Sequence, residues 1–373
     1  MNVKSRAKVG AAILGAAALG VGILAAPASA DAPIRQLAGV GSDTTQYVMN
    51  GLANGSVVVN AGGANYVTSW DAVAQTGAAD PFTTKNPATT PGCTFTRAEA
   101  NGSSNGIKLL NADIANGGSV CLDFARSSRQ PNDTSNADLT WIPFAKDAVT
   151  WATDLGSTIG SETPGNSNNP SLTTAQLKEI YTTCKYTWTD NATPPVVHTH
   201  TDVRPLLPQA GSGTRTYFLT SIGVTEAQVT AAKASTDCAG KYNDNIQEHD
   251  GTAITNLNQI MPYSVAQWIA QGKSLPGVPN RRDQSRLRNV GGVAPTTGSG
   301  SALALNPSFV FTRDVYNVVQ TSRLNEAAID EAFVVKSAVP GDTADVCQDT
   351  TTITTYGFAT IPNCGATTLT GKS

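Results

Sequence analysis

The sequence predicts an α/β protein of two lobes, and two observations support this fold class. Short apolar strands alternate with amphipathic helices along the chain, which is typical of α/β architectures. The chain has 373 residues, and removal of an N-terminal targeting segment of 30 leaves 343. That length suffices for two lobes, because one domain has about 100 to 200 residues.

The first 30 residues have the pattern of a signal peptide. A basic start with Lys4, Arg6 and Lys8 precedes an apolar stretch at 11–26, and residues 28–30 read Ala-Ser-Ala, an A-x-A cleavage site. The apolar stretch is shorter than the roughly 20 residues that a membrane-spanning helix needs. We therefore expect a secreted, soluble protein that begins near residue 31. With no cysteine after the cleavage site to carry a lipid, we expect no anchor.

The composition argues against nucleic acid and anionic membranes as partners. Charged residues make up 14% of the chain and the net charge is −3, so no strong basic field attracts nucleic acid or an anionic membrane. Any affinity for an anion must come from a local site. We expect a monomer without a cofactor.

Six cysteines lie in the exported part of the chain, and none forms a C-x-x-C motif. An even count in an oxidising compartment favours three disulfides over a metal site, although six cysteines allow 15 connectivities. Pairing of nearest neighbours closes each loop within one stretch of chain. The expected pairs are Cys93–Cys121, Cys184–Cys238 and Cys347–Cys364.

In the first half of the chain, strands lead into polar loops. Residues 34–40 form a strand that runs into the loop 41–45, and Tyr47, Val48 and Leu52 mark a helix behind it. The Gly-, Asn- and Thr-rich stretch 77–106 is expected to be a loop.

A second strand at 119–125 ends before Pro131. Residues 141–145 and 148–152 look like two strand segments on either side of Lys146 and Asp147.

The second half repeats the pattern. Residues 172–181 predict a helix, with Thr173 and Gln176 as a capping box. A strand at 203–207 leads to the Gly/Ser loop 211–215, and Tyr217, Phe218 and Ile222 continue as a helix. Residues 260–265 are expected to return the chain to the first lobe. The predicted lobes are 31–146 with 263–373, and 147–262.

The loops 41–45 and 211–215 each follow a strand and open a helix. Free backbone N–H groups and the positive helix end favour an anion there, glycine permits close approach, and Ser and Thr hydroxyls add donors. Ser42, Asp43 and Thr214 could equally be plain helix caps. Two loops of like build in half-chains that face each other favour a shared anion site.

Several of these stretches resemble the phosphate-binding proteins of ABC importers. The run 172–181 with Trp188 and Asp190 is similar to the family's "LT..QL..IF...W.D" helix, and residues 211–215 with Phe218 to its "GSGT...F" loop. Residues 39–42 and 260–263 match its first loop and its return strand. The resemblance covers most of 34–265 loosely. It implies a type 2 periplasmic-binding-protein fold, in which each lobe has a central mixed sheet flanked by helices and the ligand cleft lies between the lobes.

The resemblance also implies the ligand contacts. They fall on three loops and are Ser42, Thr44, Ser127, Ser128, Ser212, Gly213 and Thr214. This chain departs from the family at two places, with Ser128 where an acidic residue is usual, and Pro208 and Gln209 where an arginine is typical.

Arginines near the loops can supply the missing cation. Arg126, Arg129 and Arg215 lie in or beside them, and a guanidinium fork suits tetrahedral oxyanions, although each could also be a surface arginine. Asp43 repels an anion unless it accepts a proton that the ligand carries. A protonated phosphate can donate that proton and sulfate cannot.

The sequence thus predicts a secreted solute-binding protein for phosphate or a phosphate ester, with an ABC importer as a possible partner. The alternative is an extracellular interaction protein on the same fold that binds no oxyanion. The pairs His198/His200 and Glu248/His249 read as polar loop and strand residues rather than metal ligands, and Arg281–Arg288 as a basic surface cluster. With no nucleophile elbow, phosphate-binding P-loop or H-E-x-x-H motif in the sequence, we expect no enzyme activity.

Overall fold

The structure is a computed structural model that describes residues 32–74, 78–118, 120–165, 168–336 and 341–373. The predicted signal peptide lies outside the described residues.

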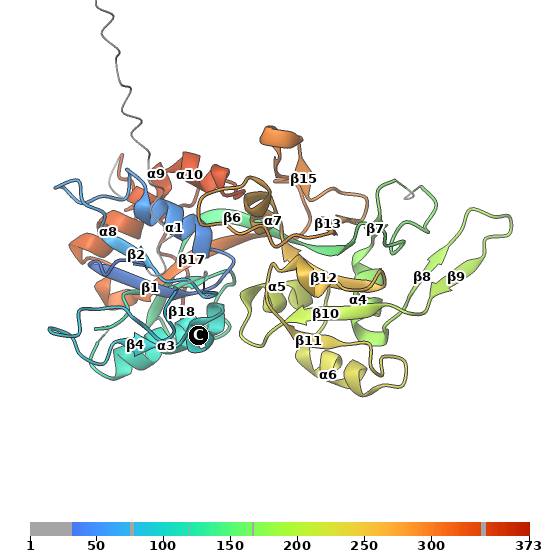
Figure 1. The fold of residues 1–373 in the computed structure, drawn as a ribbon, viewed down its shortest axis with the longest axis horizontal. Helices are drawn as coiled ribbons and strands as arrows, with labels where there is room; N and C mark the ends of the chain where they lie inside the picture. Colours follow the sequence, from blue (N-terminus) through green and yellow to red (C-terminus); the bar gives the residue numbers. More distant parts are fainter. Residues whose placement is uncertain (1–31, 75–77, 119, 166–167, 337–340) are drawn as a thin grey trace, which may run out of the picture.

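A mixed sheet of ten strands runs through the molecule (Figure 1). Its order is β11-β10-β12-β6-β17-β5-β1-β2, and β13 and β18 pair with β6 beside this path. The strands are β1 (Leu37–Gly41), β2 (Val67–Ser69), β5 (Phe124–Ser127), β6 (Leu139–Asp154), β10 (Arg204–Pro208), β11 (Asn243–Ile246), β12 (Gln259–Ser264), β13 (Ser285–Leu287), β17 (Thr312–Gln320) and β18 (Thr370–Gly371). The predicted α/β class with mixed sheets is confirmed.

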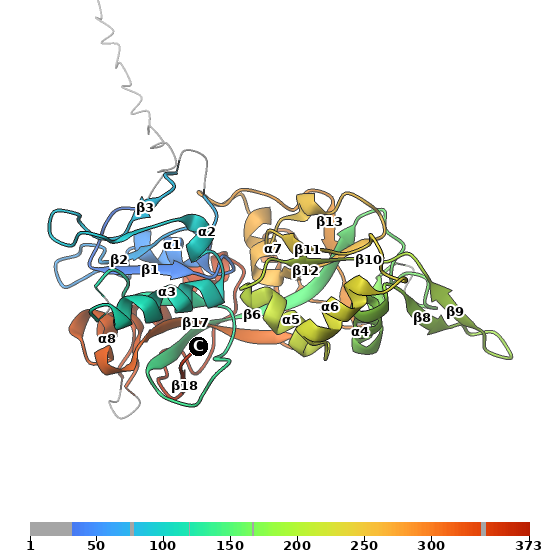
Figure 2. The same ribbon diagram turned by 90° about the horizontal axis from the view of Figure 1, so that it is seen from below.

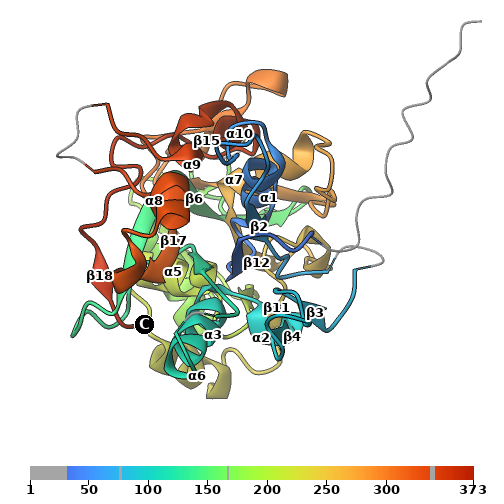
Figure 3. The same ribbon diagram turned by 90° about the vertical axis from the view of Figure 1, so that its left-hand side faces the viewer.

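Helices cover both faces of this sheet (Figures 1 and 3). They are α1 (Gln46–Asn54), α2 (Arg97–Ala100), α3 (Ser103–Ala115), α4 (Thr174–Thr183), α5 (Gly213–Ser221), α6 (Glu226–Ala234), α7 (Val265–Gly272), α8 (Ala327–Phe333), α9 (Asp345–Gln348) and α10 (Thr350–Thr355). Four two-stranded sheets lie outside the main one: β3 (Phe82–Thr83) with β4 (Thr94–Phe95), β7 (Ser171–Leu172) with β14 (Asn289–Val290), β8 (Tyr186–Thr189) with β9 (Val197–His200), and β15 (Thr296–Thr297) with β16 (Ala304–Leu305).

The stretch 77–106, which we expected to be loop, contains β3, β4, α2 and the start of α3. The expected helix at 172–181 is confirmed as α4, and both hydrogen bonds of the Thr173/Gln176 capping box are present.

The two strand segments predicted on either side of Lys146 and Asp147 form one continuous strand, β6. The two charged residues do not break it because the antiparallel neighbour β17 sets an opposite charge across from each. Asp314 faces Lys146 and Arg313 faces Asp147 in the register. Cross-strand pairs of opposite charge stabilise a sheet, so a polar dipeptide can stay inside the strand.

Side chains alternate across the first part of the sheet and build a core on each face. Phe124, Ile142 and Val319 face α1 and α8, whereas their chain neighbours face α3. Those neighbours are Ala125, Trp141 and Val318. This alternation follows from the two-residue period of a strand.

The other end of the sheet has its own core. Helices α4, α5 and α6 pack there against β10 and β12 through residues such as Leu177, Phe218 and Ile260 (Figure 2). Along β6 the buried side chains change from one core to the other between Ala145 and Ala148. We call the part that contains β1, β2 and β5 the first lobe, and the part that contains β10, β11 and β12 the second.

We propose that the chain crosses between the lobes at the middle of β6, where the first boundary was predicted, and again at the start of β17. The return was predicted at residue 263, and just after it Ala266 packs in the core of the first lobe while Val265 and Ile269 pack in that of the second. Val290, Leu305 and Phe309 pack with the second lobe, and Val315 is the first residue of β17 in the core of the first.

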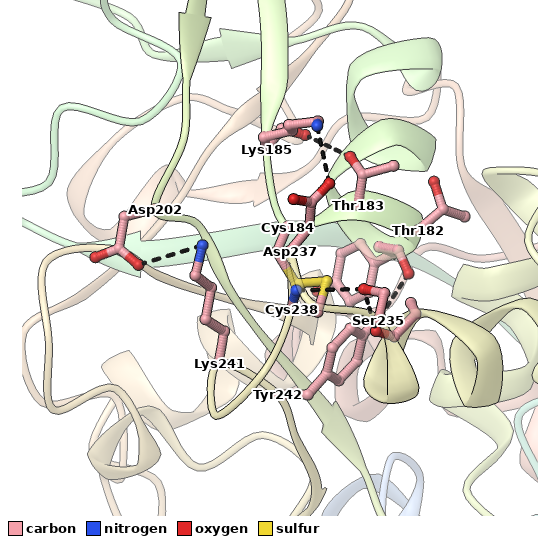
Figure 4. The surroundings of a disulfide bond; sticks show 12 residues. Thr182, Thr183, Cys184, Lys185, Asp202, Ser235, Asp237, Cys238, Lys241 and Tyr242 are labelled. Carbon is pink, nitrogen blue, oxygen red and sulfur yellow. Dashed lines mark hydrogen bonds and ion pairs between the residues drawn. A yellow bond between two sulfur atoms is a disulfide. The ribbon is translucent and has the colours of Figure 1, made fainter.

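All three predicted disulfides are present: Cys93–Cys121, Cys184–Cys238 and Cys347–Cys364. Figure 4 shows the second of them, which ties the end of α4 to the segment after α6. Within the described ranges, no helix combines the length and apolar content that crossing a bilayer requires.

Candidate functional site

Hydroxyl groups from three loops meet in a buried cluster between the lobes. Ser42 and Thr44 come from the loop between β1 and α1, Ser128 follows β5, and Thr214 lies in the first turn of α5. Ser42 Oγ lies 3.1 Å from Ser128 Oγ, and Thr44 Oγ1 lies 3.1 Å from Thr214 Oγ1. All four residues are inaccessible to solvent. The structure therefore brings together the loops that the sequence singled out.

Ser103, at the start of α3, is a member of this cluster that the sequence analysis missed. Its Oγ accepts a hydrogen bond from the backbone N–H of Ser128 at 3.0 Å and lies 3.2 Å from Ser128 Oγ. The N-termini of α1, α3 and α5 thus meet at one place. The first turn of a helix leaves N–H groups without intrahelical partners, and three such turns together attract negative charge.

Gly213 allows the second lobe to contact these hydroxyls. A Cβ atom on Gly213 would lie 2.3 Å from Ser103 Oγ and 2.4 Å from Ser128 Oγ. Beside it, Ser212 caps α5 by accepting a hydrogen bond from Arg215 N at 2.9 Å. Only glycine fits at position 213 while the lobes stay this close.

Arg313 is the cation of the cluster, and it comes from β17. Its Nη2 donates to Thr214 Oγ1 at 2.9 Å and to Thr44 Oγ1 at 3.4 Å, one residue from each lobe. The same nitrogen lies 2.9 Å from Asp147 Oδ2, which holds the guanidinium in place. Its Nη1 is buried and has no hydrogen-bond partner among the described residues.

Asp147 is itself fixed by two donors. Its Oδ1 accepts hydrogen bonds from Ser264 Oγ at 2.8 Å and from Ala266 N at 3.1 Å. The ion pair with Arg313 therefore sits where the two crossing strands meet the start of α7. Burial of a charged pair is tolerated only with such additional partners.

Two carboxyl groups and an imidazole adjoin the hydroxyls. His249 Nε2 lies 3.2 Å from Glu248 Oε2, 3.4 Å from Asp43 Oδ1 and 3.1 Å from Thr44 Oγ1. Gln247 Nε2 donates to Asp43 Oδ2 at 2.7 Å. Asp43, Glu248 and His249 are buried.

Burial and mutual interaction shift the protonation of these three groups. Burial and the neighbouring Asp43 carboxylate raise the pKa of Glu248. Burial works against ionisation of Asp43 too, but the charge and hydrogen bond of His249 outweigh it and lower the pKa of Asp43. For His249, burial lowers the pKa, and the two carboxyl groups more than offset this and raise it to about 9.

These three residues are also the types that bind metal ions, and their ligand atoms lie within 4.8 Å of one another. The contact made by the other ring nitrogen of His249, Nδ1, does not suit a metal site. A metal on Nε2 needs a proton on Nδ1 that is donated to an acceptor. Here Nδ1 faces the backbone N–H of Ser264, a donor, at 3.3 Å. Nε2 therefore carries a proton and presents an N–H, not a lone pair, to the carboxyl groups.

The three arginines considered from the sequence are buried or nearly so, and their hydrogen bonds serve the scaffold. Arg215 donates to Glu226 Oε1 and Oε2 at 2.8 and 2.6 Å and to the carbonyl oxygens of Pro208 and Asp244. Its guanidinium is thus engaged by the surroundings of α6 and β11, and because Arg215 is buried it is not the surface arginine of the alternative.

Arg126 and Arg129 support the loops from behind. Arg126 donates to the carbonyl oxygens of Ser42 and Gly41, and Arg129 donates to Ser104 Oγ at the first turn of α3. Ser127 makes a local turn, with its Oγ donating to the carbonyl oxygen of Arg129 at 2.7 Å. Arg126 and Ser127 therefore shape the first two loops.

Signals for the missed residues exist in the sequence. Ser103-Ser104-Asn105 precedes Ile107 and Leu110 at helical spacing, which is a helix start inside a stretch that we took for loop. The dipeptides Lys146-Asp147 and Arg313-Asp314 are complementary when strands run antiparallel. Glu248 and His249 were interpreted from the sequence as polar loop residues, whereas both are buried beside the hydroxyls.

Other candidates lie apart from this cluster. On the hairpin β8–β9, His198 pairs with Asp190, and His200 pairs with Glu162 from the segment between β6 and β7. An open hollow of about 500 Å³ is lined by Asp154, Ile254, Thr255, Asn256, Leu257 and Asn258. None of these lining residues carries a positive charge, so the hollow does not suit an anion.

Residues 58–328 match the family model of the PBP superfamily domain. Among solved structures, an ABC-type phosphate transport receptor from Vibrio cholerae is 15% identical over 87% of this chain and 100% of its own, with a TM-score of 0.47. A phosphate binding protein from Stenotrophomonas maltophilia is 14% identical over 88% of this chain and 91% of its own, with a TM-score of 0.41. Curated proteins gave no match. These structural similarities are too low to identify a ligand.

Proposed function

This chain belongs to the PBP superfamily, and we propose that it is a secreted solute-binding protein that holds a small oxyanion, phosphate or a phosphate ester, between its lobes. The observation that carries the proposal is the buried cluster of hydroxyls, helix N-termini and Arg313. The interface between lobes is where a binding site is most often built.

The cluster offers many donors and few acceptors, which is what an oxyanion requires. Thr44, Ser128 and Thr214 can each turn a hydroxyl hydrogen toward a ligand. Arg313 Nη1 is a charged, buried donor without a partner among the described residues. Leaving such a group unpaired costs about 1 to 3 kcal/mol or more, so an anion that reaches it gains a strong contact.

Arg313 takes the place of the arginine that the resemblance led us to look for before the third loop. Its Nη2 already contacts Thr44 and Thr214. The two hydroxyls belong to different lobes, so an anion bound beside this guanidinium touches both. Asp43 supplies one acceptor, which favours a ligand that carries a proton.

Secretion, and binding without chemical turnover, are part of the same proposal. Three disulfides suit an oxidising compartment outside the cytoplasm. A transporter in the membrane is the partner that a captured oxyanion implies.

One observation favours the alternative of an interaction protein without a ligand. The hydroxyls are satisfied by one another, as in the Thr44–Thr214 contact between the lobes. In addition, Ser104 N donates to the carbonyl oxygen of Gly211 at 3.1 Å across the same interface. A protein that only needed its lobes closed could use these contacts as they stand.

Calorimetric titration with phosphate and sulfate separates the two functions. The wild type is expected to bind phosphate. The double variant Arg313→Gln/Asp147→Asn removes the cation without leaving Asp147 as an unpaired buried charge, and it should lose about 1.5 to 3 kcal/mol of binding free energy.

Arg204→Gln, at the opposite end of β10 from the third loop, is the control and should bind like the wild type. Absence of phosphate and sulfate binding by the folded wild type would favour the interaction protein. Equal affinity of the double variant and the wild type would remove Arg313 from the site.

A further inference from the structure

The carboxyl group of Glu248 lies between the first and third loops. Its Oε2 is 3.4 Å from Thr44 Oγ1 and 3.2 Å from His249 Nε2, and Ser212 adjoins the carboxyl group. The residue is fully buried. Its second oxygen, Oε1, is buried and finds no hydrogen-bond partner in the described part of the chain. A buried carboxyl oxygen without a partner is costly unless it carries a proton or meets a ligand.

Too few hydrogen-bond donors surround Glu248 and Asp43 to stabilise both carboxyl groups in the ionised form. The Nδ1 atom of His249 faces Ser264 on the far side of the ring, so only its Nε2–H points toward Glu248 and Asp43. Two buried carboxylates that share one donor repel each other, and such a pair holds one proton between them.

The proton of the pair belongs on Glu248. Asp43 receives a hydrogen bond of 2.7 Å from Gln247 and the favourable field of Arg281, both of which stabilise its charge. Among the charged and titratable groups, Glu248 is faced by Asp43 from the first loop and by its chain neighbour His249. Arg313 and Asp147, from the crossing strands, reach it only through Thr44. Burial and Asp43 raise the pKa of Glu248, in line with this assignment.

Resting on the proposed function, we propose that Glu248 binds the oxyanion as a neutral carboxylic acid that donates the O–H of its unpartnered oxygen. The proton stays on Glu248 throughout. Phosphate then receives a hydrogen bond from Glu248 and gives one to Asp43, whereas sulfate can only receive. Once Glu248 is ionised, the donor is lost and a second negative charge faces the ligand, so the affinity for every oxyanion falls.

The test is calorimetric titration with sulfate and with phosphate from about pH 6 to about pH 8, below the pKa of about 9 of His249. Sulfate isolates the protein's own protons because its charge does not change over this range. For the wild type, affinity for sulfate should fall about tenfold for each pH unit above the pKa of Glu248, the slope for one linked proton. The variant Glu248→Gln keeps a neutral donor of the same shape, and its affinity for sulfate should stay near the wild-type value at about pH 6 and should not change with pH.

The exposed Glu331→Gln is the matched control and should keep the pH profile of the wild type. A variant Glu248→Gln that binds no oxyanion, or that shows the same alkaline loss as the wild type, would overturn the inference. Infrared spectroscopy gives a second readout on the unmodified protein. A neutral-carboxyl band should be present at neutral pH and should move when sulfate binds.

If the variant does not fold, the infrared measurement decides alone, and a wild type without such a band refutes the role of Glu248. Failure of the proposed function gives a different result. In that case the folded wild type binds neither sulfate nor phosphate at any pH.

Discussion

Gly213 sets how closely the third loop can approach the hydroxyls of the first lobe. A methyl group there would lie 2.3 Å from Ser103 Oγ and 2.4 Å from Ser128 Oγ, closer than real Cβ contacts. Because both serines are buried and hydrogen-bonded to each other, they cannot turn aside without losing that bond. The size of the side chain at position 213 therefore determines how closely the two lobes can approach each other.

Gly213→Ala is expected to hold the lobes apart and to weaken phosphate binding at least about tenfold, the equivalent of one lost hydrogen bond to a charged group. Titration calorimetry measures the affinity, and small-angle scattering measures the separation of the lobes. Gly62→Ala, whose new Cβ would meet only Asn60 Oδ1 at 3.3 Å, is the control. Unchanged affinity in Gly213→Ala would show that the lobes do not need this contact.

Two buried arginines show why the site could be predicted only in part. Arg215 stands next to Thr214 in the chain, which made it the natural candidate, yet Glu226 and two carbonyl groups accept four hydrogen bonds from its guanidinium. Arg313 lies 99 residues from Thr214 and contacts it directly. Adjacency in sequence does not say where a long side chain points. The hydroxyls on the loops were predictable because short side chains stay where the backbone puts them.

At the scale of elements, local sequence patterns predicted the helices and strands that are stabilised by contacts within their own segment. The helix α4 was predictable from Thr173 and Gln176, which cap it within its own sequence. The continuity of β6 was not, because it depends on the pairing of Lys146 with Asp314 and of Asp147 with Arg313 across β17. Missing α3 also meant missing Ser103. Errors in the elements thus became errors in the site.

The Cys184–Cys238 disulfide joins the elements α4 and α6 and closes a loop with a sequence separation of 54. Replacing both cysteines by serine is expected to lower the free energy of unfolding by about 4 kcal/mol, from the larger entropy of the open unfolded chain. Urea titration followed by circular dichroism measures it. Since the bond lies in the second lobe away from the hydroxyls, phosphate affinity of the folded variant should be unchanged. A loss below about 1 kcal/mol would contradict the entropic account.

At the scale of the whole molecule, β6 links the two cores through one rigid strand. Trp141 packs in the first lobe and Trp151 in the second, so each reports on a different core. We propose that the change of core near Asp147 marks the first boundary between the lobes. The second proposed boundary has no strong signal in the sequence, because Val290 and Leu305 lie in two-residue strands and Phe309 lies outside the strands.

Shared strands should make the lobes unfold together. Single-tryptophan variants that keep only Trp141 or only Trp151 are expected to show the same transition in urea. Phosphate at about 100 times its Kd should raise the free energy of unfolding by about 2.7 kcal/mol at both probes. Two separate transitions, or a gain at one tryptophan alone, would show that the cores are not coupled.

The strands β6 and β17, which run through both lobes, also limit where the chain can be cut into fragments or joined into chimeras. Asp147 and Arg313 face each other at the crossing, with one core on each side of them. A cut anywhere in β6 or β17 therefore leaves each fragment with half a strand and an unpaired sheet edge, a template for aggregation. Chimeras that exchange one half for that of another protein must carry both strands intact. Insertion of a reporter domain should instead use a surface turn such as the tip of the β8–β9 hairpin, which belongs to neither crossing strand.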